Sequence, residues 1–295
     1  MLPLVDDFLL DLQANNYSVG TVEAYKRYLV AFNCFLDENN ISFDEINRQT
    51  ITAYKAHLAS GGKNTANQGI HSDRPPTPHT INYKLVGLRV YLRYLISIDY
   101  ASPIAPETVE NLKVVSKQPQ VPGIRDLIRL IEAPSPQVNI RELRDKAILE
   151  TLFHTGLKVS ELVSLDRDQV DSEHNRLALK GKGLKIRILL LPNPVAQWID
   201  RYLQSRQDHF RPLFVRHSGE RDTRKDGERM RLTVRSIQRI VIKYAARCGL
   251  SIRATPETLR HCFAAYLIEE SANAVPLRVL FGHQSLDAVT RYVHA

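Results

Sequence analysis

Several features that often define a protein class are scarce or missing in this sequence of 295 residues. Its three cysteines, Cys34, Cys248 and Cys262, have spacings that fit neither a disulfide framework nor a zinc motif. No apolar run approaches the roughly 20 residues needed to cross a bilayer. The opening stretch MLPLVDDFLLDL has aspartates among its apolar residues and no basic segment, unlike a signal peptide. We therefore expect a cytoplasmic protein without disulfides or a metal site.

The chain carries an excess of positive charge. Lysine and arginine number 40 against 32 acidic residues, which gives a formal charge of +8 and a pI of about 9.4. Such an excess indicates an anionic partner, and by itself it fits nucleic acid, an acidic protein or a membrane surface. The length and the 43% hydrophobic content suffice for two compact domains.

The first third of the chain is predicted to be helical. Apolar residues recur at helical spacing in two segments within 2–39, and again in 51–59 and 81–97. The stretch GGKNTANQGIHSDRPPTPHT at 61–80 is rich in Gly, Asn and Pro and is predicted to be a loop. Prolines punctuate residues 101–122, so we place an N-terminal helical domain at 1–113 and a linker at 114–122.

The remainder, 123–295, is predicted to be mostly helical with one small antiparallel sheet. Helical segments are expected at 124–134, at 144–156 with Gly156 as C-cap, directly after it, at 194–206 and from Thr233 to Gly249. The β-rich runs HNRLALK and KIRILLLP are joined by Gly181-Lys182-Gly183, which indicates a hairpin with a lysine at its tip. The arginine-dense stretch 216–239 is either a solvated loop or a phosphate contact, and the sequence leaves both open.

The stretch from Thr255 to Tyr292 carries the chemistry-bearing residues. Thr255 before Pro256 predicts a helix start, with Arg260 about one turn in. A turn at Phe281-Gly282-His283 precedes a second helix start at Ser285. Taken singly, such an arginine, histidine and tyrosine are usually structural.

The order and spacing of the segments that contain this arginine, histidine and tyrosine indicate a common function. The segments PETLRHCFA, FGH and YVH resemble, in order and spacing, the catalytic block of the tyrosine recombinases of the phage integrase and Xer family. The resemblance implies a site-specific recombinase that cleaves and rejoins DNA through a 3′-phosphotyrosyl intermediate, without metal, ATP or other cofactor. It also implies a catalytic domain at 123–295, an N-terminal core-binding domain, and four protomers assembled on DNA.

The same resemblance assigns roles. Tyr292 matches the nucleophile, Arg260 the second arginine and His283 the second histidine-type position. Lys182 matches the lysine that protonates the leaving 5′-oxygen. Duplex DNA contacts are expected from basic residues on the helices and hairpin, namely Lys26, Arg27, Lys84, Arg89, Arg93, Lys185, Arg235 and Arg239.

Two positions depart from the family pattern. In TGLKVSEL, Lys158 stands where the family has its first arginine, and it lacks the bidentate fork of a guanidinium. Glu257 stands at the first histidine-type position, three residues before Arg260, where it would share a helix face with that arginine and either point towards the phosphate or form an ion pair with Arg260. A glutamate is also favoured by the helix dipole at a first turn. The alternative is therefore a DNA-binding protein of the same fold with impaired or no cleavage.

Overall fold

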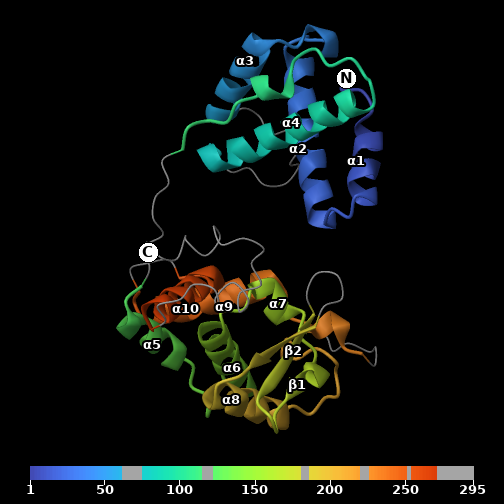
Figure 1. Cartoon of the computed structure of the whole chain (residues 1–295). Coiled ribbons are helices and arrows are strands. Elements are labelled where there is room, and N and C mark those ends of the chain that lie inside the picture. The colour runs from blue at the N-terminus through green and yellow to red at the C-terminus, as the bar shows by residue number, and fades with distance from the viewer. Residues whose placement is uncertain (62–74, 115–121, 181–185, 220–225, 251–253, 271–295) are drawn as a thin grey trace. The chain divides into compact units, whose positions relative to one another are not determined.

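The computed structural model describes residues 1–61, 75–114, 122–180, 186–219, 226–250 and 254–270. The chain divides into two compact units, Met1–Ser116 and Lys117–Ala295, so the division falls within the predicted linker. Helices predominate, and a small antiparallel sheet lies in the second unit (Figure 1). This confirms the predicted fold class. None of the described helices is both long and apolar enough to span a membrane.

Helices build the described part of the first unit, with short 3₁₀ turns at Phe43–Glu45 and Pro106–Thr108. The helices are α1 Val5–Ala14, α2 Val19–Glu38, α3 Arg48–Ala59 and α4 Pro78–Ser97. Side-chain caps set where they begin: the Ser18 and Thr77 hydroxyls accept backbone N–H groups of the first turns of α2 and α4. The helix α3 begins three residues earlier than predicted, because Asn47 caps it in the same way.

The core of this unit lies where α2 and α4 cross (Figure 1). Gly87 marks the closest approach, since a Cβ there would come within 2.9 Å of the Tyr28 ring. A residue with any side chain would force the Tyr28 ring or the helix backbone to shift. The apolar faces of the helices supply buried Leu29, Phe32, Leu36, Leu85, Leu88 and Leu92.

Polar side chains of α4 bind the chain segment that leads out of this unit. We call Asn82, Arg89 and Arg93 the α4 clamp. Asn82 exchanges two hydrogen bonds with the backbone of Leu112, at 2.7 and 3.0 Å. Arg89 donates hydrogen bonds to the Val109 carbonyl and the Asn111 side chain, and Arg93 donates to the Glu107 carboxylate. The α4 clamp therefore holds the exit segment against the helix as far as Leu112.

The second unit surrounds the helix α6, Ile140–Thr155. Ala147, Ile148, Leu149 and Leu152 are fully buried, because α8 and α10 pack against α6. Gly156 ends the helix in the left-handed conformation, φ +59°, as predicted. The other helices are α5 Ile124–Glu132, α7 Val159–Val163, α8 Asn193–Ser205, α9 Val234–Arg247 and α10 Pro256–Glu270.

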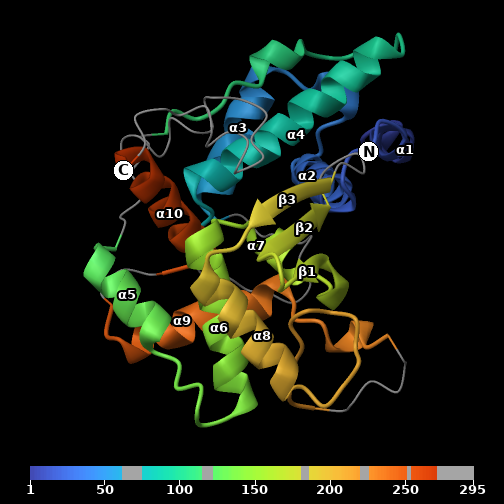
Figure 2. The same cartoon turned by 60° about the horizontal axis from the view of Figure 1, so that its bottom comes forward.

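The sheet has the order β1-β2-β3, with strands Val170–Asp171, Arg176–Lys180 and Ile186–Leu190 (Figure 2). The antiparallel pairing of β2 with β3, from Arg176 opposite Leu190 to Lys180 opposite Ile186, confirms the predicted hairpin strands. The two-residue β1 was not predicted. Along β3, Leu189 is buried and Arg187 is partly buried, whereas their neighbours Ile186, Ile188 and Leu190 are exposed.

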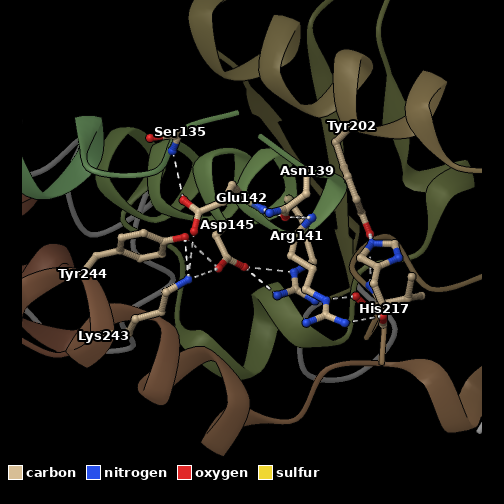
Figure 3. A network of polar contacts seen from close by, with 11 residues as sticks. Ser135, Asn139, Arg141, Glu142, Asp145, Tyr202, His217, Lys243 and Tyr244 are labelled. Carbon is tan, nitrogen blue, oxygen red and sulfur yellow. Dashed lines mark hydrogen bonds and ion pairs between the residues drawn. The ribbon is translucent and has the colours of Figure 1, made fainter. Parts of the chain in front are cut away.

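A buried polar network joins the first half of α6 to α9 (Figure 3). Asp145, 2% exposed, accepts two hydrogen bonds from Arg144, at 2.6 and 3.0 Å, and one from the Tyr244 hydroxyl at 3.0 Å. Arg144 also donates to the Val215 carbonyl. Glu142 lies beside this cluster and pairs with Lys243 at 3.2 Å. The network fixes α6, whose other end carries Gly156.

The described part of the arginine-dense stretch is built into the fold. Arg231 donates to the carbonyls of Val163 and Leu165 and pairs with the buried Asp166 at 2.7 Å. Val215 forms an isolated β-bridge with Arg231. For this arginine, therefore, neither expectation holds: its contacts are to backbone and carboxylate groups within the unit.

Candidate catalytic site

Arg260 reaches the loop that follows α6. Thr255 caps α10 as predicted, because its hydroxyl accepts the Thr258 N–H at 3.1 Å. Arg260 lies in the second turn, is 2% exposed, and donates a hydrogen bond from Nη1 to the Gly156 carbonyl. The helices α10 and α6 pack together, so the start of α10 meets the C-terminal end of α6.

Lys158 follows two residues after Gly156 and is exposed. It precedes α7, and its backbone N–H donates to Oε2 of Glu161 at 2.8 Å. Leu157 between them is buried and anchors the loop in the core. The structure therefore brings two of the predicted catalytic cations, Arg260 and Lys158, to the same end of α6.

Glu257 lies differently from our expectation. Its side chain is 57% exposed, whereas Arg260 three residues later is buried, so the two do not present a common surface. The Glu257 Oε1 atom lies 3.6 Å from Nε2 of His261, one turn further along α10. Sequence reasoning missed His261, although the i, i+4 spacing of a glutamate and a histidine is a recognisable signal.

Four predicted residues lie outside the described part of the chain: Tyr292, His283, Lys182 and Lys185. The strand ends that flank two of them, Lys180 and Ile186, are described and paired with each other.

The residues predicted to contact DNA fall into three groups. Exposed residues on α2 and α9 are Lys26, Arg27, Arg235 and Arg239. Arg89 and Arg93 belong to the α4 clamp, where each binds the exit segment. Lys84 requires a correction, because it is only 7% exposed and burial lowers its pKa. Its spacing from Ile81 and Leu88 places it on the buried face of α4.

Two residues that sequence reasoning missed, Glu161 and Arg187, lie beside this loop. Nη2 of Arg187 on β3 lies 3.6 Å from Oε1 of Glu161 on α7. The signal for Glu161 was its position three residues after Lys158, as in a capping box. Nothing in the sequence indicated its partner, 26 residues away, because that contact depends on how the sheet packs on α7.

The metal-ligating side chains and the cysteine next to α10 residues of the site were the other candidates for chemistry in the described residues. No group of three His, Cys, Asp or Glu side chains gathers there to bind a metal. Cys262 neighbours the site in sequence, but burial raises the pKa of its thiol to about 11. Such a thiol stays protonated at neutral pH and is a poor nucleophile.

Comparison with known proteins agrees with this geometry. Residues 125–295 match the phage integrase family, and residues 1–103 match the phage integrase SAM-like domain. Tyrosine recombinase XerC of Syntrophus aciditrophicus is 28% identical over 97% of this chain and 90% of its own length. Tyrosine recombinase XerC of Thermodesulfovibrio yellowstonii is 32% identical over 73% of this chain and 71% of its own length.

Solved structures show the same fold. The post-cleavage complex of XerH site-specific recombinase with a palindromic difH substrate has a TM-score of 0.71 at 18% identity, covering 95% of this chain and 78% of that one. A lambda integrase dimer bound to a COC′ core site has a TM-score of 0.70 at 14% identity, covering 98% of this chain and 75% of that one.

This chain therefore belongs to the phage integrase family. Both family models match it, and Arg260 of α10 lies at the end of α6. Within this family, the chain is an Xer-like tyrosine site-specific recombinase, an enzyme that cleaves and rejoins DNA.

Proposed function

We propose that this enzyme cleaves one strand of a specific duplex site by attack of Tyr292, and that Arg260 and Lys158 hold the scissile phosphate. The observation that supports this proposal most directly is the position of Arg260 and Lys158 at one end of α6. Cations gathered at a phosphate stabilise the negative charge of the transition state.

The proposed step balances without a cofactor. The Tyr292 hydroxyl releases its proton to solvent as its oxygen forms a bond to phosphorus, and the bond from phosphorus to the 5′-oxygen breaks. Lys182 gives its proton to the departing 5′-oxygen, and His283 hydrogen-bonds a non-bridging oxygen. The products are a 3′-phosphotyrosyl link and a free 5′-hydroxyl. In the reverse reaction, the 5′-hydroxyl of a strand from a second duplex attacks the phosphotyrosyl link and releases Tyr292. Rejoining therefore needs no external energy source.

The assembly and the DNA contacts belong to the same proposal. Four protomers bring two duplexes together in the cytoplasm, and exchange passes through a Holliday junction. Phosphates of the duplex are contacted by exposed basic residues of each unit, namely Lys26 and Arg27 of the first and Arg235 and Arg239 of the second. The lambda integrase relative, bound as a dimer to a core site, supports assembly on DNA.

A suicide half-site with a nick near the scissile phosphate tests the nucleophile. The parent chain should form a covalent adduct on a denaturing gel, whereas Tyr292→Phe should form none and bind DNA with nearly unchanged affinity. Tyr266→Phe is the matched control, because Tyr266 is an exposed tyrosine of α10, and it should form adduct like the parent. An adduct in the Tyr292 variant would refute the assignment, and parent binding without adduct would favour the alternative of a non-cleaving protein.

A further inference from the structure

A cavity lies at the N-terminal end of α6, apart from the candidate catalytic site. Its volume is about 520 Å³, within the range of about 300–1,000 Å³ that is usual for small-molecule sites. Ile140, the first residue of α6, belongs to its wall, whereas Arg260 and Lys158 lie at the other end of this helix. The 16 residues of α6, at about 1.5 Å each, separate the two ends by roughly 24 Å. The cavity is therefore distinct from the place where the scissile phosphate is proposed to bind.

One hydrogen-bond donor in the cavity wall is left without a partner among the described residues. The hydroxyl of the buried Tyr202 lies 3.0 Å from Nε2 of His217, which lines the cavity (Figure 3). The Val215 N–H already donates to the Tyr202 oxygen, so the hydroxyl proton of Tyr202 is donated to Nε2. The imidazole is neutral at pH 7, because its pKa is lowered to about 4, and it therefore carries its proton on Nδ1. No described residue accepts a hydrogen bond from this N–H group.

The charges around His217 favour an anion. Burial is the main cause of its low pKa, and Arg144, Arg206 and Arg141 lower the pKa further. Asp208 acts in the opposite direction, but its carboxylate accepts two hydrogen bonds from Arg206, which neutralises its charge. The electrostatic potential at the imidazole is therefore positive.

The rest of the cavity wall suits an apolar group. Ile140, Phe210 and Met230 contribute apolar side chains to it, and Arg216 adds a further positive charge. The Phe210 ring is held in place because it packs against Gly227, whose positive φ of 65° and missing side chain allow this close approach. The wall thus combines a hydrogen-bond donor, positive charge and a rigid aromatic surface, a combination typical of sites for small ligands.

We propose that this cavity binds a small organic anion, whose oxyanion group accepts the Nδ1–H of His217 and whose apolar part lies against Phe210 and Met230. The proposal is independent of the cleavage chemistry, because the residues that line the cavity include none of the proposed catalytic residues. Binding can therefore be measured on the full chain without DNA.

Benzenesulfonate is a suitable probe, because it joins an aromatic ring to an oxyanion that stays ionised, and benzyl alcohol is its uncharged counterpart. In NMR spectra of the histidine-labelled chain, the signal of His217 is identified by its loss in His217→Gln. Benzenesulfonate at up to about 10 mM, enough to saturate a site with a Kd near 1 mM, should shift this signal, whereas benzyl alcohol should not. An unshifted His217 signal, or an equal shift with the alcohol, would overturn the proposal.

Substitutions of Gln207 test the charge preference without disturbing the core. Gln207 lines the cavity and is exposed, so Gln207→Glu and Gln207→Lys should fold like the parent. In calorimetric titrations, the glutamate should weaken benzenesulfonate binding by about 3- to 10-fold and the lysine should strengthen it. Gln197→Glu is the matched control, since this exposed position lies about 12 Å before the end of α8, beyond the Debye length at physiological salt. It should bind like the parent, and equal affinities of the two Gln207 variants would refute the anion site.

The pH dependence tests whether His217 contacts the anion. A bound anion favours the imidazolium and raises the pKa of His217, so binding is linked to proton uptake. Affinity for benzenesulfonate should therefore rise as the pH falls from about 7 to about 5 in the parent and stay constant in His217→Gln. An equal rise in the variant would overturn the assignment of His217.

A competition experiment separates a small anion from a phosphate of DNA. Duplex DNA added to the complex with benzenesulfonate should leave the shifted His217 signal in place. Displacement of the probe by an equimolar duplex would assign the cavity to a backbone phosphate and refute a site for small anions.

Discussion

Replacing Asp145 with asparagine should destabilise the second unit severely. Asp145 is buried and accepts one hydrogen bond from the Tyr244 hydroxyl (Figure 3). It also accepts two hydrogen bonds from Arg144. Asparagine has nearly the same shape, so the substitution removes charge without creating a cavity. It leaves the guanidinium of Arg144, a residue only 8% exposed, without the carboxylate that it bonds twice.

Breaking a buried ion pair by removing one partner typically costs 3–5 kcal/mol, roughly. The asparagine oxygen still accepts one hydrogen bond, and Arg144 keeps its bond to the Val215 carbonyl, so we expect about 3 kcal/mol, the lower end of that range. Tyr244→Phe removes two hydrogen bonds, one to Asp145 and one from the half-exposed Lys243, but leaves no buried charge unpaired, so it should cost about 1–2 kcal/mol.

Urea denaturation of the full chain measures this difference directly. The sequence has one tryptophan, Trp198, on α8 of the same unit, so its fluorescence reports the unfolding of that unit. A slope of about 2–3 kcal/mol per M predicts a midpoint lowered by about 1 M or more for Asp145→Asn. If Asp145→Asn lost no more stability than Tyr244→Phe, the charge of Asp145 would not stabilise the network.

Three further predictions concern chemistry, pH and salt. Lys158→Arg with Glu257→His should cleave a suicide half-site at least roughly tenfold faster than the parent, because it restores a bidentate donor at position 158 and the histidine of the family pattern at position 257; an equal or lower rate would give Glu257 a positive role or refute the alignment. Burial, with Arg144 and Arg206 nearby, lowers the pKa of His217 to about 4. Because the unfolded chain therefore binds this proton at a higher pH than the folded chain, the free energy of unfolding of the second unit should fall by about 1–2 kcal/mol as the pH falls from about 6.5 to 4. His217→Gln should remove that part of the pH dependence in Trp198 fluorescence titrations, and an unchanged slope would contradict the assignment. Affinity for duplex DNA should fall by orders of magnitude from about 50 to about 300 mM salt in a binding titration, and a flat response would argue against a wide phosphate-binding surface.

Local signals in the sequence predicted most helices and the hairpin correctly. Hydroxyl caps such as Thr255 and the C-cap Gly156 act within one turn, so their effect is visible in a short window. The internal hydrogen bonds of Arg231 were not predictable in this way, because its partners Val163 and Leu165 lie more than sixty residues earlier in the chain. An arginine-rich stretch looks solvated until the fold supplies carbonyls and carboxylates for it.

In the candidate site, too, the sequence indicated local features but not the contacts between residues far apart in the chain. Motif order predicted that Lys158 and Arg260 belong to one site, and the structure places both at the C-terminal end of α6, where Arg260 donates to the Gly156 carbonyl. The exposure of Glu257 was missed because sharing an i, i+3 spacing does not decide which residue of the pair faces the core. The pairing of Glu161 with Arg187 needed the packing of a strand on a helix, which no spacing encodes.

The α4 clamp also sets the length of the tether between the two units. Asn82 holds the chain at Leu112, and α5 begins at Ile124, so only residues 113–123 separate the two anchored ends. At about 3.3–3.6 Å per residue that stretch spans at most roughly 40 Å. Once one unit has bound DNA, a tether this short keeps the other at an effective concentration in the range of about millimolar. Every residue released from α4 would lengthen the tether and dilute the second unit, so for a duplex that both units contact, the three side chains of the α4 clamp would affect the affinity of the whole chain.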